Sequence, residues 1–242
     1  MTEIFAHRGS SGTHPENTLP AMKAAILSGA DGIELDIHVL KSGELIVMHD
    51  ERVDRTTNGT GFLKDYTLSE VKKLVIGKRL FRKIRVPTLE EIFKLVSGTD
   101  MILNIELKTD VFEYEGIEQK VLALADKFPE VKRMYSSFNP DTLIRLRDLN
   151  PTAKLALITH ENLDEVLPLH EKIQLDAVHP PVKAMKNPIL KQIAARYWTV
   201  NKEETITHFI DANVKGMMTD FPERAAALRN NLHEQNAFII NR

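Results

Sequence analysis

Residues 32–39 read Gly-Ile-Glu-Leu-Asp-Ile-His-Val, and apolar side chains alternate with ionisable ones along this stretch. Such alternation predicts a β-strand, whose successive side chains point to opposite faces. Glu34, Asp36 and His38 therefore share one face of this strand. In a parallel barrel the inward face would ordinarily present valine or leucine to the core, so these ionisable side chains point to a functional site.

Seven further strands are predicted along the chain, and helical patterns alternate with them almost to its end. The eight strands are predicted at Ile4–Arg8, Gly32–Val39, Met101–Leu107, Val131–Phe138, Ala153–Thr159, Ala177–His179, Tyr197–Val200 and Val214–Thr219. Strands that alternate with helices are typical of a parallel sheet. Eight of them in 242 residues favour an α/β fold of the (β/α)₈ TIM-barrel type, since such barrels run to about 250 residues. An open, doubly wound sheet is the structural alternative.

Residues that cap helices support this alternation. Asn17 is predicted to cap the first helix, and Asn139 stands before a proline at the start of another. Thr67 and Thr88 each precede a glutamate by three residues. At that spacing the two side chains exchange hydrogen bonds with free amides of the first helical turn.

The regular alternation breaks between residues 51 and 87. This segment holds the turn-rich stretch Thr56–Gly61 and a short helix that begins near Thr67. We interpret it as a small insertion in one loop of a single domain that spans residues 1–242. It follows an extra strand at Glu44–His49, which the Ser42-Gly43 turn would pair with the second strand.

The composition narrows the class of protein. Lysine and arginine total 32 against 34 for aspartate and glutamate, a net charge of −2 without the basic excess typical of nucleic-acid-binding proteins. The absence of cysteine excludes disulfides, thiolate metal sites and a cysteine nucleophile. We see neither a signal-peptide pattern nor an apolar run of roughly 18 residues, so the chain is predicted to be cytoplasmic without a transmembrane segment.

One stretch of the insertion is strongly basic. Lys78–Arg85 carries five cations in eight residues. Charge runs of this kind are usually solvated faces. The alternative is a patch that attracts anionic substrates or a lipid surface.

Three carboxylates are candidates for a metal site. Glu34 and Asp36 lie on the second strand, and Glu106 alternates with Asn104 and Lys108 on the next one. Carboxylates that face a common interior repel one another unless a cation lies among them. Ligands that are all oxygen suit Mg²⁺ or Ca²⁺ rather than zinc, so we expect one divalent cation of that kind. The alternative is that some of them pair with Lys108 or Arg8, or point outward.

The predicted hairpin brings a histidine to the same place. If Lys41 pairs with Glu44 across the turn, then Asp36 faces His49, and opposed residues point to one face. A slip of one residue would send His49 to the other side. His7 ends the first strand, which neighbours the second in a barrel.

Two histidines near one metal suit general acid and base catalysis at neutral pH. His7 and His49 would form this pair. Arg8 and Lys108 would supply positive charge for an anionic substrate, and the guanidinium fork of an arginine matches phosphate oxygens. Such a set is suited to displacement at phosphorus.

These residues fall in an order that resembles glycerophosphodiester phosphodiesterases. The matching motifs cover nearly the whole chain: His7-Arg8-Gly9, Pro15-Glu16-Asn17-Thr18, Glu34-x-Asp36, His49-Asp50, Arg55-Thr56-Thr57, Gly59-x-Gly61, Glu106-x-Lys108, Ser137-Phe138, Trp198-Thr-Val-Asn201 and Thr219-Asp220-Phe221-Pro222. The resemblance implies a (β/α)₈ barrel, a divalent metal, and hydrolysis of glycerophosphodiesters to glycerol 3-phosphate and an alcohol. In the family mechanism the glycerol 2-hydroxyl attacks phosphorus and gives a cyclic phosphate that water opens.

The resemblance also assigns roles by position. It makes Glu34, Asp36 and Glu106 the metal ligands, His7 and His49 the acid/base pair, Arg8 and Lys108 the phosphate contacts, and Trp198 a wall for the glycerol moiety. We expect His49 to be the acid and His7 the base.

Three other functions remain as alternatives. The first is an activity like that of lysophospholipase D or sphingomyelinase D on lipid substrates. The second is a non-catalytic barrel that binds a phosphate ligand or a partner, although all five residues His7, Glu34, Asp36, His49 and Glu106 are present. The third, a sugar-phosphate isomerase, would not need this set together. The sequence predicts no oligomeric state.

Overall fold

The structure, a computed structural model, describes residues 1–77 and 84–240 of the chain. Most of the basic stretch Lys78–Arg85 lies outside these residues, so its role stays a prediction. The nine strands are β1 (Glu3–His7), β2 (Gly32–Val39), β3 (Leu45–Val47), β4 (Ile102–Leu107), β5 (Arg133–Ser137), β6 (Leu155–Ile158), β7 (Ala177–His179), β8 (Arg196–Tyr197) and β9 (Gly216–Thr219).

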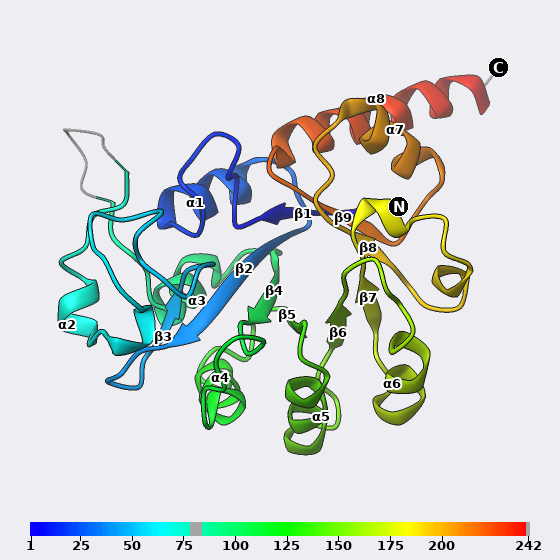
Figure 1. Ribbon diagram of the computed structural model, residues 1–242. Helices are drawn as coiled ribbons and strands as arrows, with labels where there is room; N and C mark the ends of the chain where they lie inside the picture. The colour runs from blue at the N-terminus through cyan, green and yellow to red at the C-terminus, as the bar shows by residue number, and fades with distance from the viewer. Residues whose placement is uncertain (78–83, 241–242) are drawn as a thin grey trace.

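Helices follow most of the strands and lie outside them (Figure 1). The α-helices are α1 (Leu19–Leu27), α2 (Leu68–Val71), α3 (Leu89–Val96), α4 (Ile117–Ala125), α5 (Pro140–Leu149), α6 (Val166–Ile173), α7 (Glu203–Asp211) and α8 (Pro222–Ile240), and the 3₁₀ turns are Leu63–Asp65, Val182–Ala184 and Pro188–Lys191. Among the described residues, none of these helices combines the length and the apolar character needed to cross a membrane.

Eight parallel strands form a nearly closed barrel. Their order is β7-β6-β5-β4-β2-β1-β9-β8, and β3 pairs antiparallel with β2 at its end. The two outer strands of this order are joined by isolated parallel bridges, Val178 to Ala195 and Pro181 to Trp198. The predicted (β/α)₈ barrel is therefore confirmed, and the open, doubly wound sheet is wrong.

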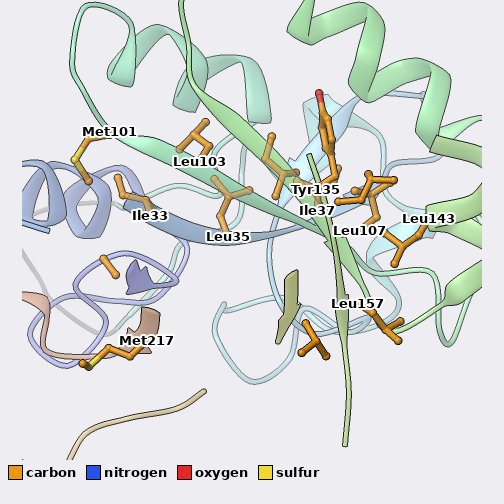
Figure 2. Close-up of a cluster of buried hydrophobic side chains, with 14 of the residues drawn as sticks. Ile33, Leu35, Ile37, Met101, Leu103, Leu107, Tyr135, Leu143, Leu157 and Met217 are labelled. Atoms are coloured by element: carbon orange, nitrogen blue, oxygen red, sulfur yellow. The ribbon is translucent and has the colours of Figure 1, made fainter. Parts of the chain in front are cut away.

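The alternation of β2 separates two environments. Ile33, Leu35 and Ile37 are fully buried among the apolar side chains between the strands and the outer helices. Figure 2 shows these three side chains with Leu103 and Leu107 of β4 in one cluster. The even-numbered residues of β2 point the other way, into the barrel, as the sequence pattern predicts.

A small apolar layer fills the barrel below its open end. It is formed by Phe5, Met134, Ala156, Ala177 and Met218. Phe5 stands two residues before His7 on β1, and Ala177 stands two residues before His179 on β7. The layer therefore supports polar side chains that lie nearer to the carboxyl ends of the strands.

The predicted caps are mostly confirmed, with one correction. The backbone N–H of Thr88 donates to Glu91 Oε2 at 2.7 Å, and that of Glu91 donates to Thr88 Oγ1 at 3.2 Å. Asn17 does not cap α1, because Thr18 takes that position and its Oγ1 accepts from the backbone of the first turn. Asn17 has a positive φ of 54° and turns its side chain toward β2 instead.

The segment between β3 and α3 has a hydrophobic cluster of its own. Val53, Leu63 and Val71 of this segment are fully buried and pack with Leu40 and Ile46 of the β2–β3 hairpin. The segment thus rests on the hairpin rather than on the barrel strands. That the chain forms one domain with an insertion at residues 51–87 stays a prediction.

Candidate functional site

A cavity of about 260 Å³ opens at the carboxyl ends of the strands. Its position is typical of the active sites of parallel barrels. All eight sequence-predicted site residues except Asp36 line it, together with several neighbours. The lining residues are His7, Arg8, Glu34, His49, Asn104, Glu106, Lys108, Asp110, Phe138, Ile158, His160, His179, Trp198 and Met218.

The three predicted metal ligands lie together. In the sheet register Asp36 of β2 is directly opposite Glu106 of β4, and Glu34 stands two residues earlier on β2. One carboxylate oxygen of each lies within 4.8 Å of the other two, and all three side chains are buried. The expectation that alternation and strand pairing bring these carboxylates together is confirmed.

The surroundings of the three carboxylates do not fully balance their negative charge. Burial and the neighbouring carboxylates of Asp36 and Glu106 raise the pKa of Glu34 well above its ordinary value. Burial and Asp36 raise the pKa of Glu106 to about 7, although Lys108 opposes this. Asp36 Oδ1 is buried without a hydrogen-bond partner among the described residues. A cluster of oxygen ligands with surplus negative charge and an unused ligand atom fits a hard divalent cation.

Two basic side chains border the carboxylates. Lys108 Nζ lies 2.9 Å from Glu106 Oε1, and Arg8 Nε lies 3.7 Å from Asp36 Oδ2. The backbone N–H of Arg8 also donates to Glu34 Oε2 at 2.8 Å. Burial disfavours the charge of Lys108, but Glu106 and Asp36 outweigh it and raise the pKa of Lys108, so this side chain stays charged. The pairing considered from the sequence is thus present, and it coexists with the clustering of the carboxylates.

His7 is oriented by a carboxylate from the far end of the chain. Its Nδ1 lies 2.7 Å from Asp220 Oδ1, and an ionised carboxylate only accepts, so Nδ1 carries the proton. Its Nε2 points toward Glu34 Oε2 at 4.0 Å. Burial of Asp220 is outweighed by its hydrogen bonds from His7, Asn201 and Ser11, which lower its pKa to about 2.

The predicted hairpin register is wrong by one residue. The observed register pairs Ile37 with Val47, whereas the predicted one placed Asp36 opposite His49. The reason is the turn: its loop holds three residues rather than two, and the last of them, Gly43, adopts a left-handed φ of 97°.

His49 nevertheless reaches the cavity, because β3 ends at Val47 and the chain bends there. His38 Nε2 donates to the carbonyl of His49 at 3.2 Å, and the hydroxyl of Tyr114 donates to His38 Nδ1 at 2.9 Å. Burial lowers the pKa of His38, so it stays neutral and keeps the tautomer that this pair of bonds requires. His38, on the same strand as the metal candidates, therefore braces the backbone of His49.

The ring of His49 has a carboxylate partner as well. Its Nδ1 lies 2.7 Å from Asp50 Oδ1. Arg55 bonds both oxygens of Asp50, from Nε at 2.6 Å and from Nη2 at 2.9 Å. These hydrogen bonds from Arg55 are the main reason why the pKa of Asp50 lies well below its ordinary value.

Aromatic side chains form one wall of the cavity. Trp198 meets Phe138 edge to face with ring centroids 5.9 Å apart, and Phe138 stacks on His160 at 4.8 Å. The indole N–H of Trp198 donates to the carbonyl of His179 at 2.8 Å, which fixes the ring. Trp198, singled out in the sequence, is thus part of a larger aromatic surface.

Two polar side chains face the cavity without a partner among the described residues. Neither amide atom of Asn104 and neither ring nitrogen of His179 makes a hydrogen bond, and both side chains are fully buried. Burial, followed by Arg196, lowers the pKa of His179 well below its ordinary value, so this ring is neutral. Unpartnered groups of this kind are rare inside proteins and indicate a place for ligand or water.

Sequence reasoning did not assign the contacts that hold the site together. Asn17 Nδ2 donates to Asp36 Oδ2 at 2.8 Å, and Asn201 Nδ2 donates to Asp220 Oδ2 at 2.6 Å. Both residues stand in the motifs quoted above, and that was the available signal. Their roles depend on contacts with strands far away in the sequence.

Known proteins resemble this chain over almost all of its length. The sequence pattern of the glycerophosphoryl diester phosphodiesterase family matches residues 7–224. A glycerophosphodiester phosphodiesterase of Caldanaerobacter subterraneus subsp. tengcongensis is 40% identical over 92% of this chain and 95% of that protein. One of Bacillus altitudinis is 37% identical over 95% of this chain and 98% of that protein. The crystal structure of a glycerophosphodiester phosphodiesterase from Agrobacterium tumefaciens superposes with a TM-score of 0.80 at 28% identity, over 94% of this chain and 100% of the other.

Proposed function

The chain belongs to the glycerophosphoryl diester phosphodiesterase family, a family of phosphoric diester hydrolases, and we propose that it hydrolyses glycerophosphodiesters to glycerol 3-phosphate and an alcohol. The observation that carries this proposal is the joint geometry of one cavity. Three clustered, buried carboxylates, two of which line the cavity, occur there with two histidines, each of which is bonded to a carboxylate of its own. A phosphate-binding barrel without activity would have no use for two histidines oriented in this way.

Glu34, Asp36 and Glu106 would hold one divalent cation, Mg²⁺ or Ca²⁺. The support is the donor set itself: three buried carboxylates, two of them with raised pKa values, and one oxygen of Asp36 without a partner. When bound, such an ion polarises a phosphoryl oxygen and stabilises negative charge on the reacting group. Lys108 and Arg8 lie beside this position and would bind the remaining phosphate oxygens.

The two histidines would transfer the protons. In the first step, His7 Nε2 takes the proton of the glycerol 2-hydroxyl as its oxygen attacks phosphorus, and His49 donates a proton to the departing alcohol oxygen. The attack is intramolecular and therefore gains from proximity. In the second step, water opens the cyclic phosphate and the two histidines exchange roles. The carboxylate partners, Asp220 and Asp50, keep each Nδ1–H donating, so each Nε2 is free for the chemistry.

The polar and aromatic linings would bind the glycerol moiety. Asn104 and the neutral ring of His179 offer unused donors and acceptors for hydroxyl groups. Trp198 and Phe138 offer an apolar wall for the carbon skeleton. A lining that combines polar and apolar groups suits a small polyol better than a hydrocarbon chain.

The test is release of glycerol 3-phosphate from glycerophosphocholine and from glycerophosphoethanolamine. We expect release with Mg²⁺ or Ca²⁺, none in EDTA, and a loss of roughly 10²- to 10⁴-fold in His7→Ala and in His49→Ala. Absence of release by the intact chain with either metal would contradict the proposal. A lysophospholipid assay would then separate a lipid substrate from binding without hydrolysis. That the reaction takes place in the cytoplasm stays a prediction from the sequence.

A further inference from the structure

Arg55 makes four side-chain hydrogen bonds near the cavity. Besides its two bonds to Asp50, it donates to both oxygens of Glu16, from Nη1 at 2.8 Å and from Nη2 at 2.7 Å. Glu16 lies between β1 and α1, and Asp50 follows β3. One guanidinium therefore joins two carboxylates that are 34 residues apart in the sequence.

Each of these two carboxylates also bonds a residue that has a role in the proposed hydrolysis. Asp50 bonds the ring of His49 at 2.7 Å, and Glu16 Oε1 accepts from Arg8 Nη1 at 2.9 Å. Arg8 and His49 both line the cavity, whereas Arg55 does not. The side chains thus form one continuous hydrogen-bonded row, and Arg55 is its middle member. The row runs through Arg8, Glu16, Arg55, Asp50 and His49.

Only an arginine can occupy this position. A guanidinium has five N–H donors in a planar fork, so it can bond two carboxylates in pairs of parallel bonds. A lysine ammonium is a compact charge without that geometry. The charges of the two arginines and the two carboxylates of the row also balance.

We propose that Arg55 is a positioning residue of the hydrolysis, which fixes His49 through Asp50 and Arg8 through Glu16. It touches neither the substrate nor the metal ligands. The insertion from residue 51 onward then has a function in this reaction, because it supplies the arginine that links Glu16 to Asp50. This inference rests on the proposed function, so its test includes a readout that does not depend on activity.

The chain offers a matched control in Arg52. This residue begins the same segment, has a side chain that is 49% exposed against 50% for Arg55, and pairs with a carboxylate, Asp54, at 3.0 Å. Asp54 bonds no residue of the cavity. Arg52→Gln therefore removes a similar surface ion pair and leaves the site untouched.

The kinetic experiment compares Arg55→Gln, Arg55→Lys and Arg52→Gln in the metal-loaded enzyme. We expect Arg55→Gln to lower kcat roughly 10- to 100-fold, the range for residues that hold a catalytic or metal-binding group, with a smaller change in KM. Arg55→Lys should recover only a small part of this loss, because it cannot hold both carboxylates. Arg52→Gln should keep kcat within about twofold, as expected of an exposed ion pair.

A second measurement follows the ring proton of His49 by NMR in the metal-free protein. The Nδ1 protons of His7 and His49, each bonded to a carboxylate, are assigned with Asp220→Asn and Asp50→Asn. In Arg55→Gln we expect the signal of His49 to shift or broaden and that of His7 to stay unchanged. A loss of folding would change both signals, so this outcome distinguishes positioning from instability.

The proposal is overturned if Arg55→Gln keeps kcat within about twofold while its His49 signal matches that of the intact protein. It is equally overturned if both histidine signals change together in proportion to the unfolded fraction. If the intact chain hydrolyses no glycerophosphodiester, the proposed function fails. The NMR comparison then still decides whether Arg55 orients His49.

Discussion

The two histidine–carboxylate pairs of the cavity have the same internal geometry and different surroundings. Both Nδ1–oxygen distances are 2.7 Å. Asp220, the partner of His7, receives its other hydrogen bonds from neutral groups of Ser11 and Asn201. Asp50, the partner of His49, is bonded by the cationic Arg55. The pairs therefore differ in charge, although distances alone would make them equivalent.

This difference gives a physical reason for a division of labour. A proton on His7 lies next to Asp220, and no cationic side chain of the described residues bonds this carboxylate. A proton on His49 lies next to Asp50, whose negative charge Arg55 already balances. We therefore expect His7 to accept the proton of the attacking hydroxyl and His49 to donate a proton to the leaving alcohol, as expected from the sequence. The following experiments test this comparison.

The largest effect is expected from removing either ring. His7→Ala and His49→Ala should each lower kcat on glycerophosphocholine by roughly 10²- to 10⁴-fold. A p-nitrophenyl ester of glycerol 3-phosphate separates them, because its leaving group departs without a proton. On this substrate His49→Ala should lose less than about tenfold, while His7→Ala should remain as impaired as on the natural ester.

The opposite pattern, with His7→Ala rescued by the nitrophenyl ester, would reverse the assignment of acid and base. Equal loss in both variants on both substrates would remove the division of labour altogether. The control is the intact enzyme, whose rate should differ little between the two esters if bond cleavage does not limit it.

The next effect concerns the three buried carboxylates of the candidate metal site. The pKa of Glu106 is raised from 4.5 to about 7, mainly by burial, so the folded protein holds a proton there that the unfolded chain releases. Between these values the free energy of unfolding of the metal-free protein should fall as the pH rises, by roughly 3 kcal/mol at most. A bound divalent cation favours the ionised form, so its stabilising effect should grow over the same range.

Thermal unfolding in EDTA and in Mg²⁺ or Ca²⁺, at about pH 5 and about pH 7.5, measures this effect. Glu106→Gln is the control and should weaken both the fall with pH and the response to metal. A metal-free protein that becomes more stable between these pH values would contradict the expectation. Asp220, with its pKa lowered to about 2, acts in a separate window, because its contribution is lost only as the pH falls below its ordinary value.

A smaller effect is expected from the carboxylate partners themselves. Asp220→Asn and Asp50→Asn should each lower kcat on glycerophosphocholine by roughly 10- to 100-fold, the usual cost of losing a group that orients a functional side chain. On the nitrophenyl ester, only Asp50→Asn should keep most of its activity, because Asp50 is the partner of His49. If Asp220→Asn is spared instead, the charge difference between the pairs does not set their roles.

The smallest effect is expected away from the cavity. Thr88→Ala removes the side-chain half of the cap on α3 and should lower the free energy of unfolding by about 1 kcal/mol. Urea unfolding measures this, and kcat on both esters should stay unchanged. A change in kcat of Thr88→Ala would mean that stability alone affects turnover, and the comparison of the two pairs would need correction for it.

The sequence predicts the parts of this molecule that depend on local periodicity. The bounds of Gly32–Val39 and Ala177–His179 agree with the structure to the residue, and the alternation on β2 and β4 correctly brings three carboxylates together. Strand pairing then required only that sequential strands be neighbours, which is the usual arrangement.

The errors arise where one residue changes the geometry or where partners are distant. The hairpin register failed because Lys41 joins Ser42 and Gly43 in a three-residue turn, which no periodicity reveals. Asn17 carried the signal of a helix cap, but its contact with Asp36 exists only in the folded barrel. The link from Arg55 to Glu16 likewise spans two loops and leaves no mark on local patterns.

The seam between β7 and β8 has a consequence for the dynamics of the protein. Isolated bridges hold this seam, whereas continuous ladders join the other neighbouring strands, so its amide protons are expected to exchange with solvent earliest among those of the barrel. Trp198 lies on the seam and also belongs to the aromatic wall. Breathing of the barrel at this point would widen the cavity on its apolar side. Tolerance for alcohols of different bulk would then depend on how often the barrel opens, more than on any single contact.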